Sequence, residues 1–118
     1  MTREQIFMII DNTDKYSEVF KNKLKETYDF FSSKGYNFRV HALGRVISPK
    51  LGKNKRGFPF EDVLEVLNSS INYIDGEDKY VRYFNGFSAI QAKDTGEIIS
   101  FVDNNFKPKK GWRKYNAE

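Results

Sequence analysis

Regularly spaced turn signals in the second half of this chain constrain its fold more than any other feature. They are Asp75-Gly76, Asn85-Gly86 and Asp94-Thr95-Gly96. The runs between them are rich in β-branched and aromatic residues, and Asn-Gly between two such runs is typical of a tight β-hairpin turn. The pattern predicts an antiparallel meander of three or four strands, over about residues 71–74, 79–84, 87–92 and 97–102.

The first half of the chain has helical periodicity instead. A capping-box pattern at Thr2 and Gln5 predicts a short helix over about residues 3–10. Apolar side chains at fourth-residue spacing then predict a second helix over about residues 14–34. Pro59 suits the start of a further helix, because its fixed φ is already helical.

Length and element order together predict the fold class. A chain of 118 residues can bury one core but is short for two, so we expect a single domain. Helices first and strands last predict an α+β fold, with N-terminal helices packed on one face of a three- to four-stranded antiparallel sheet. The expected parts are a helical part over about 1–70, the sheet over about 71–103 and a basic tail over 104–118.

Residue types absent from the chain restrict its chemistry. It has no cysteine, which excludes disulfides, thiol catalysis and cysteine-bound zinc, and its one histidine, His41, excludes a multi-histidine metal site. We therefore expect no metal and no cofactor. No apolar run approaches the ~20 residues that cross a bilayer, so we expect no membrane insertion. We also expect a monomer.

Positive charge is concentrated in two stretches, although the formal net charge is only +4. Residues 39–60 hold six cations and no carboxylate, and residues 104–118 hold five cations and one carboxylate. Such segregation is typical of a chain with a polyanionic partner, most often nucleic acid, and the equal alternative is two solvated loops rich in lysine. Aromatic side chains among the cations of the tail can stack on bases, although Trp112 can equally pin the tail to the core. The candidate RNA-binding residues are Lys50, Lys53, Lys55, Arg56, Lys109, Lys110 and Trp112.

His41 and Arg45 share one face whether their segment is a strand or a helical turn, because they are four residues apart. An imidazole beside a guanidinium suits phosphodiester chemistry. The imidazole moves a proton, and the guanidinium holds a phosphate oxygen on which charge develops. The alternative is an ordinary surface or capping histidine.

Two strand residues are further candidates. Ser100 interrupts the last apolar run, so its hydroxyl either bonds the backbone or points into a site. Arg82 shares a strand face with Tyr80 and Phe84 and is either a surface side chain lying over them or a phosphate ligand.

Several short blocks, in this order, carry a resemblance to a known group of proteins. They are Val40-His41-Ala42-Leu43-Gly44-Arg45-Val46, then Phe60 to Leu67, Tyr80 to Gly86 and Thr95 to Ser100. Over roughly residues 38–103 the chain resembles the C-terminal RNase toxin domains of bacterial polymorphic and contact-dependent growth inhibition toxins. These belong to the BECR superfamily, which includes barnase, EndoU, colicin D and RelE-like RNases.

The resemblance implies a metal-independent endoribonuclease that commonly acts on tRNA. The ribose 2′-OH would attack its own phosphate and leave a 2′,3′-cyclic phosphate and a 5′-OH. His41 would be the acid or base, Arg45 and Arg82 would hold the phosphate, and Ser100 would orient the 2′-OH or a phosphate oxygen. The chain has no second histidine, and Tyr83 is the nearest candidate for the other proton transfer.

The resemblance also implies a biological setting. Such domains are delivered as the tail end of a larger secreted toxin and act in the cytoplasm of the target bacterium. A cognate immunity protein covers the site, and for a basic site we expect it to be acidic. The competing hypotheses are a non-catalytic nucleic-acid-binding or phage accessory protein with the same basic surface, and an immunity or adaptor protein.

Overall fold

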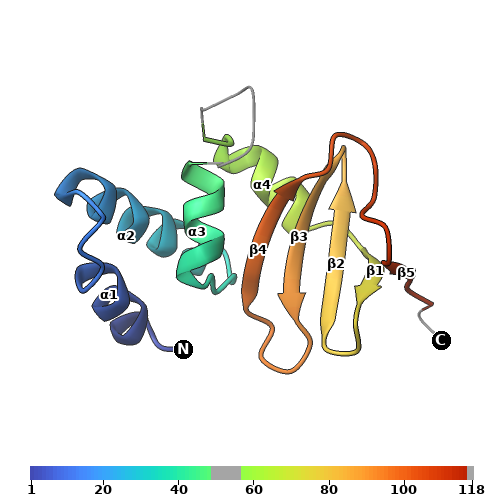
Figure 1. The fold of residues 1–118 in the computed structure, drawn as a ribbon, viewed down its shortest axis with the longest axis horizontal. Coiled ribbons are helices and arrows are strands. Elements are labelled where there is room, and N and C mark those ends of the chain that lie inside the picture. The colour runs from blue at the N-terminus through green and yellow to red at the C-terminus, as the bar shows by residue number, and fades with distance from the viewer. Residues whose placement is uncertain (49–56, 117–118) are drawn as a thin grey trace.

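The computed structural model of the chain describes residues 1–48 and 57–116. Within them, helices come first and strands last, and Figure 1 shows the helical part beside and behind the sheet. The predicted α+β class, with N-terminal helices and an antiparallel sheet, is therefore confirmed. The elements are α1 (Arg3–Asp11), α2 (Glu18–Ser33), α3 (Val40–Ile47), α4 (Phe60–Leu67), β1 (Ile71–Asp75), β2 (Lys79–Phe84), β3 (Phe87–Ala92), β4 (Ile98–Asp103) and β5 (Arg113–Lys114).

The sheet has five strands in the order β4-β3-β2-β1-β5, rather than the predicted three or four. All neighbouring strands are antiparallel. The additional strand, β5, lies in the segment predicted as a tail and pairs with β1 through Tyr73 and Ile74. The Tyr115 amide extends this pairing by donating to the Asn72 carbonyl at 2.9 Å. A strand of two residues is too short to show a periodic sequence pattern. The pairing with β1, rather than the sequence of β5, therefore determines this strand.

Side-chain hydrogen bonds to backbone amides cap the first two helices at their N-termini. The Thr2 hydroxyl accepts from the Gln5 amide and the Gln5 side chain accepts from the Thr2 amide, so the predicted capping box is confirmed. Helix α2 begins later than predicted. Its N-cap is Ser17, whose hydroxyl accepts from the Phe20 amide at 3.1 Å.

Helix α3 is anchored at the start of β4. The residue before its N-cap, Phe38, forms an isolated parallel bridge with Ile98. The Arg39 amide donates to the Ile98 carbonyl at 2.9 Å, and the Ile98 amide donates to the Asn37 carbonyl at 2.8 Å. These bonds fix the first turn of α3 beside the edge strand of the sheet (Figure 1).

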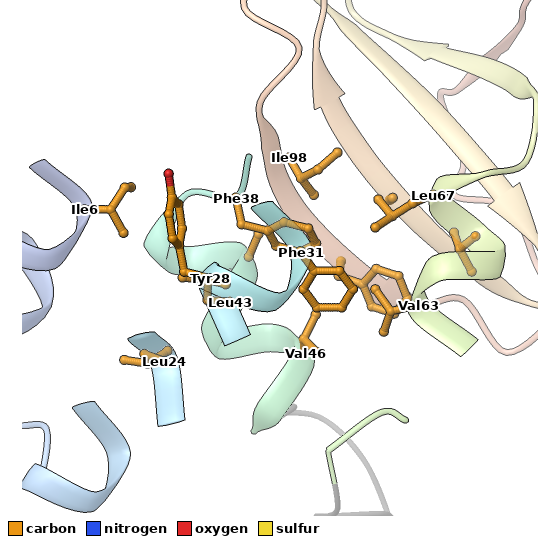
Figure 2. Packing of buried hydrophobic residues seen from close by; sticks show 14 of the residues in the cluster. Ile6, Leu24, Tyr28, Phe31, Phe38, Leu43, Val46, Val63, Leu67 and Ile98 are labelled. Atoms are coloured by element: carbon orange, nitrogen blue, oxygen red, sulfur yellow. The ribbon is translucent and has the colours of Figure 1, made fainter. Parts of the chain in front are cut away.

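The hydrophobic core lies between the helices and one face of the sheet, as Figure 2 shows. At its centre the rings of Phe31 and Phe38 stack with centroids 4.7 Å apart. Ile98 of β4 and Leu67 of α4 are both about 1% exposed or less. Each fully buried side chain of this size stabilises the fold by roughly 1.5–3 kcal/mol.

The pleat of the sheet gives it two different faces. The helix-covered face presents Phe87, Ala89 and Phe101 to the core. The open face presents the alternate residues, among them Ile90 and Ser100, which are cross-strand neighbours.

A β-bulge in β4 decides which residue goes to which face. The strand register changes from Ile90 opposite Ser100 to Gln91 opposite Ile98, so Ile99 is an extra residue. In a regular strand that kept Ile99 but had no bulge, Ile98 and Ser100 would share a face, because they are two residues apart. With the bulge, Ile98 enters the core and Ser100 lies on the open face.

Candidate functional site

The open face is hollowed into a groove of about 630 Å³, which we call the open-face groove. One wall is His41 of α3, and Ser100 of β4 lies on the floor. The opposite wall comes from the segment after β4 and includes Lys107, Lys109 and Trp112. Of the residues predicted from the sequence, the structure therefore brings His41, Ser100, Lys109 and Trp112 to one place.

His41 is exposed at the first turn of α3, and Arg45 follows one turn later. The Arg45 Nε donates to the His41 Nε2 at 3.4 Å. This contact places a guanidinium directly beside the imidazole. The predicted pairing of an imidazole and a guanidinium on one face is thus present.

Ser100 reaches the groove because of the bulge described above. It is half-buried on β4, the strand that packs directly against α3. The bridge between Phe38 and Ile98 fixes α3 two residues before Ser100 on that strand. The same anchor therefore positions His41 and Ser100.

The groove carries more positive than negative charge among its described residues. Its cations are Lys79, Lys107 and Lys109, and its carboxylates are Asp75 and Asp103. The Asp103 carboxylate also accepts from the Asn105 amide at 2.9 Å, so it is partly engaged within its own loop. Asp75 is the cross-strand partner of Lys79, so Lys107 and Lys109 are the lysines best placed to pair with a phosphate backbone.

The segment forming the far wall is fixed at both ends. At the start, the Asn104 amide donates to the Gly86 carbonyl at 2.8 Å, and its side chain pairs with the Ser88 hydroxyl. At the end, the Trp112 ring lies against Tyr73 with centroids 5.8 Å apart. Trp112 therefore attaches the segment to β1 through Tyr73 and also lines the groove; its stacking on bases stays a prediction. Among the described residues its Nε1 is the buried side-chain nitrogen or oxygen without a hydrogen-bond partner.

Arg82 does not lie near His41, which corrects its predicted place in the site. It pairs across strands with Ala89 on the helix-covered face. Its Nε donates to the Gln91 side chain at 3.1 Å, and its Nη1 donates to the Ser69 carbonyl. Arg82 thus connects the end of the helical part to the sheet and does not line the open-face groove.

Tyr83 lies on the open face but outside the lining of the groove. Its ring meets Tyr73 edge-on at 6.1 Å, and its amide donates to the Asn72 side chain at 2.9 Å. The proton-transfer role suggested for Tyr83 has no support from this position. Lys110 is exposed and does not line the groove either. Lys50, Lys53, Lys55 and Arg56 lie outside the described residues.

Sequence reasoning missed two groove lysines, Lys79 and Lys107. Alternation on β2 shows that Lys79 shares a face with Val81 and Tyr83, but not that this face is the open one. Lys107 follows the last strand, and no periodicity indicates its direction.

A second cavity, of about 530 Å³, lies between α2 and α3, and we call it the α2–α3 pocket. Arg45 lines this pocket rather than the groove. His41 lines both cavities and so stands at the boundary between them.

Glu97 is a buried carboxylate with a structural role. It is 6% exposed, and its carboxylate pairs with the Met1 amine at 2.7 Å and with Arg39 at 3.1 Å. Hydrogen bonding to that amine, and then to Arg39, holds the pKa of Glu97 below its usual value despite its burial. In the chain that begins with Met1 the two pairings connect the start of α1 and the N-cap of α3 to the sheet, and the pairing with Arg39 does not need the free amine.

No family model, curated protein or solved structure matches the chain. In the part of the chain that the structure describes, no three His, Cys, Asp or Glu side chains gather as metal ligands would. None of the helices described for residues 1–48 and 57–116 is long and apolar enough to cross a bilayer.

Proposed function

We propose that this chain is a metal-independent endoribonuclease toxin domain that cleaves tRNA and is neutralised by an acidic immunity protein. The observation that carries the proposal is the contact between Arg45 and an exposed His41 at the rim of a groove with Ser100 on its floor. The order of sequence blocks that resembles BECR-type RNase toxins supports the same function.

The chemistry needs no nucleophile from the protein. The ribose 2′-oxygen attacks the neighbouring phosphorus, and the bond from phosphorus to the 5′-oxygen breaks. The products are a 2′,3′-cyclic phosphate and a 5′-OH. His41 either takes the 2′ proton or gives a proton to the leaving 5′-oxygen, and such transfer contributes about 10²–10⁴-fold in rate.

Arg45 and Ser100 serve the phosphate and the sugar in this scheme. The Arg45 guanidinium stabilises negative charge on the non-bridging oxygens, which grows in the transition state. The Ser100 hydroxyl orients the 2′-OH or a phosphate oxygen. Lys107 and Lys109 hold the adjoining backbone, and Trp112 offers a ring for an unpaired base.

The toxin setting adds a partner and a place of action. Delivery as the tail of a larger secreted polypeptide would bring the domain into the target bacterial cytoplasm, where tRNA is abundant. An acidic immunity protein would associate quickly with the basic groove, because opposite charges steer the encounter.

The deciding experiment is digestion of total tRNA with chelator present, resolved on a denaturing gel. The wild type is expected to give discrete fragments, and His41→Ala is expected to lose at least about 100-fold in rate. His41 is exposed, so thermal unfolding of the variant should match the wild type. Lys23→Ala, an exposed cation on α2 outside both cavities, is the matched control and should cleave normally.

The outcomes separate the candidate functions. Cleavage that is equal in the wild type and in His41→Ala would show a contaminating nuclease or another site, and would overturn the proposal. Intact tRNA with a salt-sensitive band shift would favour the alternative, a non-catalytic nucleic-acid-binding or phage accessory protein that uses the same basic surface.

A further inference from the structure

The α2–α3 pocket combines aromatic surface with positive charge. Tyr16 and Phe20 are both half-buried, and their ring centroids lie 5.0 Å apart. The Lys15 ammonium stands 5.7 Å from the Tyr16 centroid, and Arg45 closes the other side. The Ser17 hydroxyl also lines the pocket, but it already accepts from the Phe20 amide as the N-cap of α2.

The charge of this pocket differs from that of the groove. Its described lining holds Lys15, Arg45 and His41 and no carboxylate, whereas Asp75 and Asp103 line the groove. An unopposed pair of cations beside two aromatic rings suits a ligand that has both an anionic group and a flat ring system. A nucleotide has both, and about 530 Å³ is within the usual size of small-ligand pockets.

The position of His41 connects this pocket to the proposed reaction. His41 is the one described residue that lines both cavities, and Arg45 touches it from the pocket side. A phosphate held at these two side chains has the groove on one side and the α2–α3 pocket on the other. An RNA strand crossing α3 at this point therefore places one nucleotide in each cavity.

We propose that the α2–α3 pocket binds one nucleotide of single-stranded RNA next to the scissile phosphate. The base stacks on Tyr16 and Phe20, and Lys15 and Arg45 hold its phosphate. That the nucleotide belongs to an RNA chain rests on the proposed function. That the pocket binds a nucleotide does not. The pocket then sets which base flanks the cut.

The binding test uses adenosine 3′-monophosphate, adenosine and inorganic phosphate as separate probes, titrated into the isotope-labelled full chain and followed by NMR. The nucleotide is expected to shift the amides of Tyr16, Ser17, Gly44 and Ser48, and to bind at least tenfold more tightly than either fragment. Shifts confined to Ser100, Val102 and Trp112 would place the nucleotide in the groove only and would overturn the inference.

Variants then test the two halves of the pocket. Tyr16→Leu keeps apolar volume in the core but removes the ring face, and is expected to weaken nucleotide binding roughly 5- to 100-fold. Lys15→Ala should weaken it several-fold. Lys93→Ala is the matched control, because Lys93 stands 5.6 Å from the Tyr80 ring in the same kind of pair outside both cavities. Unchanged affinity in Tyr16→Leu would overturn the stacking role.

Cleavage assays separate this inference from the proposed function. If the subsite exists, Tyr16→Leu changes the base preference next to the cut site more than it changes the total rate. If the wild type binds the nucleotide through Tyr16 but cleaves no tRNA, the nucleotide-binding inference stands and the proposed nuclease function is overturned. If the wild type cleaves through His41 and Tyr16→Leu keeps the same base preference, the nuclease function stands and the subsite is overturned.

Discussion

The two faces of the sheet differ in what their residues do, although they alternate along the same strands. On the helix-covered face, Phe101 and Ala89 lie in the core, and Arg82 donates hydrogen bonds to Gln91 and to the Ser69 carbonyl. On the open face, Ser100 faces a groove whose walls are His41 and a lysine-bearing segment. Neighbours in sequence therefore have different roles, stability on one side and the proposed chemistry on the other.

Substitution of adjacent residues of β4 is the strongest test of this difference. Phe101 is 3% exposed, and Phe101→Ala is expected to lower the free energy of unfolding by about 3–5 kcal/mol. Ser100→Ala should change it by less than about 0.5 kcal/mol. It should instead slow tRNA cleavage at least about tenfold, because a phosphate or hydroxyl contact is lost.

Urea unfolding and the gel assay measure these two effects. If Phe101→Ala does not fold, Phe101→Leu should lose about 1 kcal/mol and keep its cleavage rate. Loss of stability in Ser100→Ala without loss of cleavage would mean that the hydroxyl serves the strand rather than the site.

The two arginines give a second pair with opposite expectations. Arg82→Ala removes hydrogen bonds to Gln91 and Ser69, so we expect a loss of about 1–3 kcal/mol of stability and little change in the cleavage rate per folded molecule. Arg45→Ala should leave stability within about 1 kcal/mol and slow cleavage about 10²–10³-fold. A slow but stable Arg82→Ala would contradict the division between the faces.

The smallest expected effect depends on pH. It concerns Glu97 and its charge pairs with the Met1 amine and Arg39. The pKa of Glu97 is lowered in the folded chain, so its stabilisation is fully present above the ordinary pKa of a glutamate and is lost as the pH falls from there through the lowered pKa of the folded chain. Glu97→Gln should therefore cost about 1–2 kcal/mol at pH 7, through lost charged hydrogen bonds. The difference from the wild type should shrink below roughly pH 4.

Urea unfolding at pH 7 and pH 3 checks this expectation. Asp29→Asn is the control, since Arg3 lowers the pKa of Asp29 as well but both side chains are exposed. An exposed pair of this kind contributes about 0–1 kcal/mol, so its loss should be smaller. An equal loss in the two variants would show that burial of Glu97 adds nothing.

The parts of the fold that local chemistry determines were predictable from sequence. Strands β2 and β3 match the predicted ranges residue for residue, because Asn85 and Gly86 adopt positive φ values of 53° and 86° as a tight hairpin turn needs. Strand β5 and the bulge at Ile99 were not predictable, because their partners lie on other strands.

The candidate site shows the same limit. Four-residue spacing places His41 and Arg45 together in either kind of element, so their contact needed no knowledge of the fold. For Arg82, alternation shows that it shares a face with Tyr80 but not which face the helices cover. Only the packing of α4 against β2 decides that.

The extra residue of β4 makes Ile99 an unusual place in the chain for a change of length. Removal of one residue elsewhere in a strand reverses the side of every residue that follows, whereas removal of Ile99 would leave Ile98 opposite Gln91 and Ser100 opposite Ile90 in a regular ladder. A natural variant one residue shorter at this point would therefore keep its interior and the serine proposed to orient the substrate, and would differ only in the shape of the groove floor.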